Sequence, residues 1–133
     1  MSPDEIAETI QANVQFAPLV QMNDDQIFTS FLNVDSGSVS SAALYVSSSE
    51  DKSDELVVVG LAHSKYFDEI TAALLAHVNQ RATNFKNQSS AESSKLTHAV
   101  LRRTKTVIIL VVCEEYQKAE KVLDEIGAKS IKS

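Results

Sequence analysis

The stretch that decides the fold is Asp54-Glu55-Leu56-Val57-Val58-Val59-Gly60-Leu61-Ala62. Residues 56–62 are continuously apolar and rich in β-branched side chains, a pattern typical of a strand that is covered on both faces. We therefore expect this stretch to be a central strand of a sheet, around which the rest of the chain is arranged.

A long amphipathic helix is predicted directly after this strand. Ser64 is suited to cap the free amides of a helix start. The following apolar positions recur at steps of three and four residues, namely Phe67, Ile70, Leu74, Val78, the aliphatic part of Arg81, and Phe85. Positions with this spacing share one face of a helix, and we expect that face to pack on the sheet.

Three further strands are predicted. Residues 41–47 alternate in the manner of a strand near a sheet edge, and the polar residues 47–53 join them to the central strand as a hairpin. Residues 99–101 and 107–113 form a second hairpin around the segment 102–106, and residues 107–113 are again apolar on both faces. This last segment is expected to be the second central strand.

Helices are expected at both ends of the chain. Ser2-Pro3-Asp4-Glu5 has the spacing of a capping box and predicts a helix that ends before Pro18. Asn23-Asp24-Asp25-Gln26 predicts a second, short helix that includes Phe28 and Leu32. A final helix is expected from about Glu115 to Gly127, where glycine suits a left-handed cap. Residues 128–131 either add a short last strand or fray.

Together these elements predict a single α+β domain over residues 1–133. Its sheet is expected to have four antiparallel strands in the order 1-2-4-3. The long helix and the C-terminal helix are expected on one face, and the N-terminal helices on the other face or at the edge. Both central strands are apolar on both faces, so the second face must be covered by the N-terminal helices or by a partner subunit. A homodimer is therefore one of the two alternatives.

The composition excludes several classes of function. The formal net charge is −6, so nucleic acid is not expected as a partner, and Arg102, Arg103 and Lys105 are interpreted as a solvated hairpin edge. The single cysteine, Cys113, excludes an intramolecular disulfide and a cysteine metal cage. No segment approaches the about 18 apolar residues that a membrane-spanning helix needs.

No residue is predicted to be catalytic, cofactor-binding or metal-ligating. His63, His77 and His98 lack a metal-binding spacing. The chain has no Gly-x-Ser-x-Gly motif and no glycine-rich phosphate loop, since its three glycines stand far apart. The predicted topology places the His63 junction and the start of the last helix at opposite ends of the sheet, so they are not expected to share a site.

Several features together resemble a family of small lipoproteins of Gram-positive bacteria, a domain family of unknown function. They are Tyr45-Val46-Ser47-Ser48, Asp54-Glu55-Leu56, the long helix ending at Phe85, and residues 107–112 followed by Lys118-Ala119-Glu120-Lys121. The chain departs from the family pattern at Gln88 and Ser90, where a Tyr and a Pro are common. The resemblance implies a removed signal peptide, a lipidated cysteine upstream and an extracytoplasmic, membrane-anchored location.

Three hypotheses of function follow. The first is a noncatalytic extracytoplasmic domain that binds a protein or cell-envelope partner, with Tyr45, Tyr66 and Phe67 as the candidate interaction surface. The second is a small enzyme that depends on Cys113 and a histidine, which requires an exposed thiol. The third is a cytosolic regulatory domain that binds a small ligand.

Overall fold

The computed structural model describes residues 1–22 and 32–131. Its helices, in chain order, are α1 (Pro3–Asn13), α3 (Phe67–Lys86), α4 (Ser90–Thr97) and α5 (Tyr116–Ile126), with the 3-10 turns η2 (Ser36–Ser38) and η3 (Ser64–Tyr66). Its strands are β1 (Leu19–Met22), β2 (Val39–Ser47), β3 (Glu55–Leu61), β4 (Val100–Arg103), β5 (Val107–Val112) and β6 (Lys129–Ser130). The short helix predicted from Asn23 falls on residues 23–31, outside the described residues.

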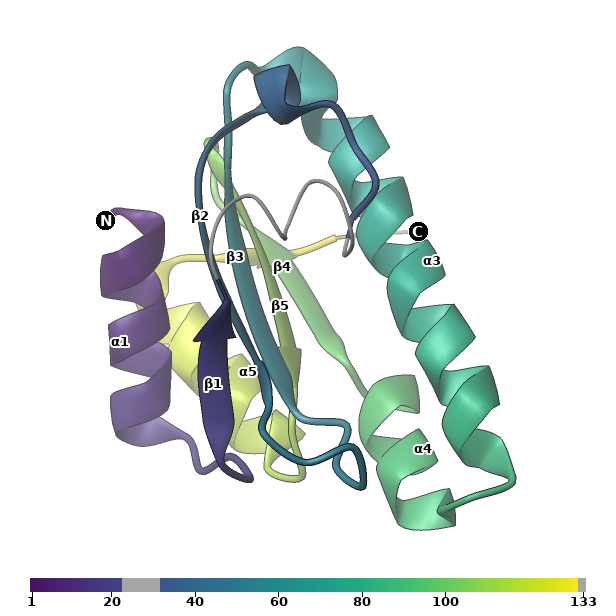
Figure 1. The fold of residues 1–133 in the computed structure, drawn as a ribbon. Helices are drawn as coiled ribbons and strands as arrows, with labels where there is room; N and C mark the ends of the chain where they lie inside the picture. The colour runs from purple at the N-terminus through teal and green to yellow at the C-terminus, as the bar shows by residue number, and fades with distance from the viewer. Residues whose placement is uncertain (23–31, 132–133) are drawn as a thin grey trace.

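The strands form one six-stranded sheet in the order β1-β2-β3-β5-β4-β6, and every neighbouring pair is antiparallel (Figure 1). β3 and β5 pair in the middle of the sheet, with Glu55 opposite Val112 and Gly60 opposite Val107. Every residue of these two strands is buried, as expected for central strands with helices on both faces.

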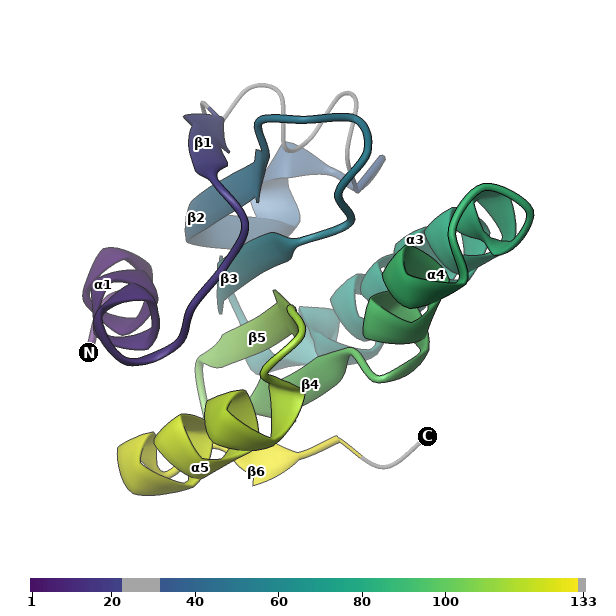
Figure 2. The ribbon, with the colours of Figure 1, turned by 90° about the horizontal axis from the view of Figure 1, so that it is seen from below.

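Two helical layers cover the sheet. α1 and α5 lie on one face, and α3 and α4 lie on the other (Figure 2). On the first face Ile6 and Ile10 of α1 share a core with Ala119 and Leu123 of α5. The core on the second face is built by α3, α4 and the other sides of the central strands, and includes Ile70, Leu74, Val78, Phe85 and Leu96.

The predicted four-stranded sheet is therefore wrong in two respects. The sheet has two additional edge strands, β1 and β6. β1 has four residues and is too short to show a clear alternation in sequence, whereas β6, with two residues, is the short last strand that was one of the two alternatives for residues 128–131. The C-terminal helix α5 does not accompany the long helix α3 but packs beside α1 on the opposite face. Since both faces of β3 and β5 are apolar, the pattern of these strands did not determine which face α5 would cover.

The helix ends follow from local chemistry. Ser2 and Glu5 form the predicted capping box, in which the Glu5 amide donates to Ser2 Oγ at 3.2 Å and the Ser2 amide donates to Glu5 Oε1 at 3.1 Å. Gly127 closes α5 in the left-handed conformation, with φ of 90°. The predicted cap at Ser64 is wrong, because His63 Nδ1 accepts the Lys65 amide at 3.0 Å and begins η3 ahead of α3.

Gly60 lies at a point of close approach between β3 and β2. The register of β2 shifts between Val39 and Ser41, and this irregularity brings two serine side chains over the glycine. A Cβ atom on Gly60 would lie 2.9 Å from Ser40 Oγ, 2.9 Å from Ser41 Oγ and 3.2 Å from the Ser41 carbonyl oxygen. A side chain at this position would therefore force the two serine side chains to move and the β2 backbone to shift slightly.

We expect Gly60→Ala to lower the free energy of unfolding by about 1–2 kcal/mol, because the added methyl group overpacks a central strand. Urea denaturation followed by circular dichroism measures the change. Gly37→Ala is the control, since a Cβ there would meet only the Asp35 side chain at ordinary contact distances. Equal stability of the two variants would contradict this reading of the β2 register.

Candidate functional site

Polar and charged side chains gather at the end of the sheet where β2 and β3 are joined. Ser53, Asp54 and Glu55 lead into β3, and each is at most 2% exposed. Partners reach them from α3, from α4 and from the connection between α1 and β1. We name this group, together with Glu92, Lys95, His77 and Arg81, the hairpin-end network.

Asp54 connects two elements that are distant in sequence. Its Oδ2 accepts the Ala17 amide, which precedes β1, at 3.1 Å. Its Oδ1 accepts Lys95 Nζ of α4 at 2.8 Å. One carboxylate thus joins the start of the edge strand β1 to the helix α4 through the end of the sheet.

Glu92 and Ser53 form the second part of the hairpin-end network. Glu92 Oε1 accepts the Ser53 amide at 2.7 Å and Ser53 Oγ at 3.1 Å, and it lies 3.1 Å from Lys95 Nζ. Ser53 Oγ also donates to the Glu92 carbonyl oxygen at 2.9 Å. Lys52, which is half exposed, lies 3.8 Å from Glu92 Oε2. Each oxygen of the buried Glu92 carboxylate therefore has a polar or cationic partner.

The pKa values of Glu92 and Lys95 are shifted in opposite directions. Burial acts to raise the pKa of Glu92, but the Ser53 amide and the Lys95 ammonium outweigh it and hold the pKa below its usual value. Burial acts to lower the pKa of Lys95, but Asp54 and Glu92 outweigh it and raise this pKa. Both side chains are therefore held in their charged forms.

Glu55 forms the third part of the network, on the α3 side of the sheet. His77 Nε2 lies 3.1 and 3.0 Å from the two carboxylate oxygens. Arg81 Nη1 forms an ion pair with Glu55 and donates to the Ser53 carbonyl oxygen at 3.0 Å. The Arg81 guanidinium also lies over the Phe85 ring, 5.6 Å from its centroid. His77, Arg81 and Phe85 follow at steps of four, so they share one face of α3.

Three cavities open around the hairpin end. Lys52 lines all three, and their volumes are about 620, 450 and 410 Å³. The smallest brings Glu55, His77, Arg81 and Phe85 together under the serine-rich hairpin loop. These four side chains bring a carboxylate, an imidazole, a guanidinium and an aromatic ring into one cavity.

The other two histidines are not part of the hairpin-end network. His63 caps η3 at the opposite end of β3. His98 follows α4 and stacks on Tyr116 with 4.6 Å between ring centroids. The register of β3 with β5 places Leu61 and Val112 at opposite ends of the pair, so the predicted separation of the His63 junction from the start of α5 is confirmed.

Cys113 is fully buried between β5 and α5. Burial, together with the negative charges of Asp54 and Glu115, raises the pKa of its thiol to about 12. A thiol with such a pKa is protonated near neutral pH and is a poor nucleophile. The exposed Cys113 that a thiol enzyme requires is therefore not found.

The aromatic residues predicted as an interaction surface do not lie together. Tyr45 is half buried against the core on the α1 and α5 face. Tyr66 and Phe67 are half buried against the core on the α3 face. Phe67 is covered by the Arg103 guanidinium at 3.7 Å from the ring centroid, and Lys65 lies 5.2 Å from the Tyr66 ring centroid. The sheet separates Tyr45 from the other two.

Arg102 was interpreted as part of a solvated hairpin edge, and for this residue that interpretation is wrong. Its side chain is buried, forms an ion pair with Asp124 at 2.6 Å and donates to the Ala128 carbonyl oxygen at 3.1 Å. Arg103 is half buried, and only Lys105 of the three is exposed. Arg102 instead joins β4 to the C-terminal end of α5.

Three features of the sequence point toward the hairpin-end network. Asp54 and Glu55 stand directly before an entirely apolar run, and carboxylates that become buried at such a place require cationic or hydrogen-bonding partners. The spacing of His77, Arg81 and Phe85 places a cation on the same face as the apolar stripe of the long helix. Glu92 and Lys95 have the spacing of a helical ion pair. None of these signals identified which carboxylate meets which cation.

Within residues 1–22 and 32–131, no group of three or more His, Cys, Asp or Glu side chains is placed to hold a metal ion. In the same part of the chain, no helix combines the length and apolarity that crossing a bilayer requires.

The structure defines an α+β domain in which helical layers enclose an antiparallel sheet and a buried ionic network closes one end of that sheet. Residues 12–113 match the family model described as Domain of unknown function (DUF4358), and the chain belongs to this family. The matched residues include the whole hairpin-end network and end before α5. No match was found among curated proteins or among solved structures.

We expect Lys95→Met to lower the free energy of unfolding by about 3 kcal/mol, because it leaves the buried carboxylates of Asp54 and Glu92 without their shared cation. Chemical denaturation at pH 7 measures the change. Lys118→Met, on the exposed surface of α5, is the matched control and should stay within about 0.5 kcal/mol of the parent. A loss below about 1 kcal/mol for Lys95→Met would contradict the structural role of this ammonium.

The lowered pKa of Glu92 predicts a specific acid dependence. Its stabilising effect is present above the unfolded-state value of 4.5 and is lost as pH falls from there through the lower folded-state pKa. Glu92→Gln removes this contribution, so its free energy of unfolding should fall less steeply below pH 4.5 than that of the parent. Denaturation at a series of pH values compares the two slopes, and parallel slopes would contradict the assignment.

Proposed function

We propose that this protein is a noncatalytic, extracytoplasmic lipoprotein domain that binds a protein or cell-envelope partner. The mutual pairing of the hairpin-end residues is the observation that supports its noncatalytic part. Asp54 and Glu92 share Lys95, and Glu55 is bound by both His77 and Arg81. Side chains that are committed to one another and to the fold in this way have few hydrogen-bonding positions left to offer a substrate.

The extracytoplasmic location is supported by the resemblance of the sequence to small lipoproteins of Gram-positive bacteria. A domain of this kind would be secreted and held at the membrane through a lipid on an upstream cysteine. It would then meet its partner in the cell envelope through side chains at the margins of the sheet. A homodimer is one arrangement that such a margin allows.

Detergent phase partitioning of the native protein from its source cells tests the proposed location. We expect the protein to enter the detergent phase and to carry a mass increment of lipid size, measured on the intact protein. Recovery in the aqueous phase, without modification and together with cytosolic markers, would contradict the lipoprotein assignment. Extracytoplasmic marker proteins are followed in the same fractions, as the control for how cell lysis distributes proteins from outside the cytosol.

A second candidate function is regulatory binding of a small ligand in the cytosol. The cavity of about 410 Å³ that Glu55, His77, Arg81 and Phe85 line favours this reading, because it combines an aromatic wall with a few polar groups. Native mass spectrometry of protein purified from its source cells would detect a retained ligand. If the protein is found in the cytosolic fraction and releases a small ligand on denaturation, regulatory ligand binding becomes the favoured function in place of the lipoprotein assignment.

A further inference from the structure

A basic surface lies at the end of the sheet opposite the hairpin-end network, on the margin that β4 and β6 form. Arg103 ends β4 and is directly opposite Lys129 of β6. Lys105 follows in the turn to β5, and both lysines are exposed. We name this surface the basic corner and define it by Phe67, Arg103, Lys105 and Lys129. It contrasts with the formal net charge of −6 of the whole chain.

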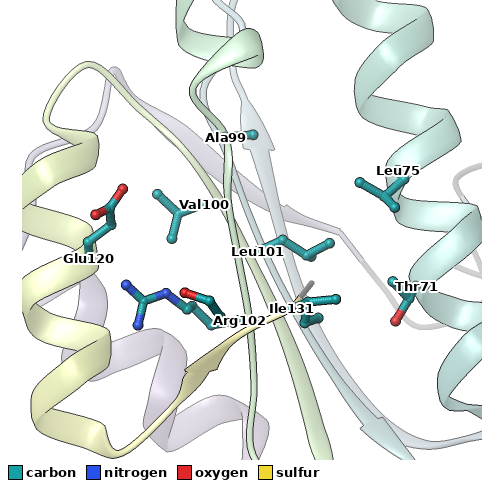
Figure 3. Close-up of a pocket in the computed structure, with 9 residues that line it drawn as sticks. Thr71, Leu75, Ala99, Val100, Leu101, Arg102, Glu120 and Ile131 are labelled. Carbon is teal, nitrogen blue, oxygen red and sulfur yellow. The ribbon is translucent and has the colours of Figure 1, made fainter. Parts of the chain in front are cut away.

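Arg103 and Lys129 point to the same side of the sheet. They are opposite each other in the antiparallel pair of β4 and β6, and residues in opposite positions share a face. Figure 3 shows the alternation beside them, in which Arg102 points toward α5 whereas Leu101 and Ile131 point toward α3. Because successive side chains of a strand alternate between faces, Arg103 and Lys129 both extend on the α3 side.

The opposition of Arg103 and Lys129 does not stabilise the fold. Like charges that are directly opposite each other across a strand pair repel and destabilise the pair. In the part of the chain that the structure describes, neither side chain takes part in an ion pair. An anionic group that a partner places between them would replace this repulsion with attraction.

Phe67 holds the Arg103 guanidinium so that the edge of this group is presented for binding. The ring covers one face of the guanidinium at 3.7 Å from the ring centroid, and Arg103 Nε donates to the Thr104 carbonyl oxygen at 3.4 Å. The two Nη groups form the planar fork that binds a carboxylate through two parallel hydrogen bonds. Lys65, at 5.2 Å from the centroid of the neighbouring Tyr66 ring, adds a further cation at this end of the molecule.

The described chain breaks off away from the basic corner. β6 runs from Lys129, opposite Arg103, toward Ile131, which bonds to β4 further back along that strand. The break at residues 23–31 follows β1 and precedes the segment that leads through η2 to β2. β1 and β2 form the opposite margin of the sheet from β4 and β6 (Figure 2).

We propose that the basic corner binds an acidic segment of a partner protein. One carboxylate would bind the Arg103 fork, and a second acidic side chain of the same segment would lie between Lys105 and Lys129. This inference rests on the proposed binding function, and it specifies the surface and the chemistry of the partner.

An acidic protein segment fits the basic corner better than an anionic membrane does. Aromatic side chains that enter a membrane surface stand open toward it, whereas Phe67 is half buried against the core and covered by Arg103. Asp68 and Glu69 follow Phe67 and are exposed. A continuous anionic layer would repel these two carboxylates, but discrete acidic side chains on one segment can be placed beside the cations alone.

Titration of the ¹⁵N-labelled protein with the capped synthetic peptide Glu-Ser-Glu-Ser-Glu tests the proposal, and Gln-Ser-Gln-Ser-Gln is the matched neutral peptide. We expect saturable shifts that cluster at Phe67, at Lys129 and at the backbone and side-chain Nε of Arg103, with the glutamate peptide alone. Added salt should weaken this binding. Absence of saturable binding, shifts scattered over the molecule, or equal binding of the two peptides would overturn the proposal.

Three variants separate the basic corner from general electrostatic attraction. Lys129→Gln should weaken binding of the glutamate peptide by roughly fivefold, whereas Lys118→Gln, on the exposed side of α5, changes the net charge equally and should have a much smaller effect. Arg103→Lys keeps the charge but removes the planar fork, and should weaken binding by a similar factor to Lys129→Gln. The parent spectrum outside the basic corner shows that each variant is folded. Equal effects of Lys129→Gln and Lys118→Gln, or full binding by Arg103→Lys, would contradict the assignment.

A membrane and a second copy of the chain are the competing occupants. Co-sedimentation with phosphatidylglycerol vesicles that Lys129→Gln abolishes would show a surface directed at the membrane. Shifts at the basic corner that grow with protein concentration in the absence of peptide would show a second copy, and either result would overturn the proposal. The lipid-anchor test remains independent, since a protein that partitions into detergent but does not bind the glutamate peptide would retain its proposed location and lose only this partner assignment.

Discussion

The burial of two adjacent carboxylates at the start of the central strand β3 is the constraint on which the rest of the structure depends. Asp54 and Glu55 precede six consecutive apolar residues of β3 and are themselves almost completely shielded from water. Moving ionised carboxylates out of water costs several kcal/mol each unless cations and hydrogen-bond donors replace the lost solvent. The domain supplies these partners from three other elements.

The placement of these partners explains how the layers are held together. Asp54 binds the amide before β1 and the ammonium of α4, while Glu55 binds two side chains of α3. The aliphatic core on each face is nondirectional and would allow the helices to slide. Directional bonds to buried charges add a restriction on position, so α3 and α4 meet the sheet at a defined place. The far end of α5 is positioned in a similar way by Arg102 and Asp124.

Much of this fold could be predicted from the sequence, and the failures have physical causes. The apolar run after Glu55, the i, i+4 stripe from Ile70 to Phe85 and the capping box at Ser2 are local signals, and each element lies where its signal predicts. The face chosen by α5 depends on competition between two equally apolar sides of the sheet, which no local pattern records. β1 is too short for periodicity to indicate it, and β6 was only one of two alternatives for residues 128–131.

The candidate site was less predictable than the fold. Histidine spacing and the lone Cys113 drew attention because these residue types carry chemistry, yet His63, His77 and His98 serve three separate local roles. The carboxylates Asp54 and Glu55 looked like a polar entry into a strand, and only the tertiary structure places cations around them.

The most direct test of this account is a double-mutant cycle on the pair of Asp54 and Lys95, with the free energy of unfolding measured for Asp54→Asn, Lys95→Met and the combined variant. If the buried charges hold the hairpin end together, the double variant should lose about 2 kcal/mol less free energy of unfolding than the sum of the two single losses. The reason is that each single variant leaves a buried charge without its partner, whereas the double variant does not. Losses that simply add would show that the two side chains act independently, and would contradict the claim that a buried ionic network closes this end of the sheet.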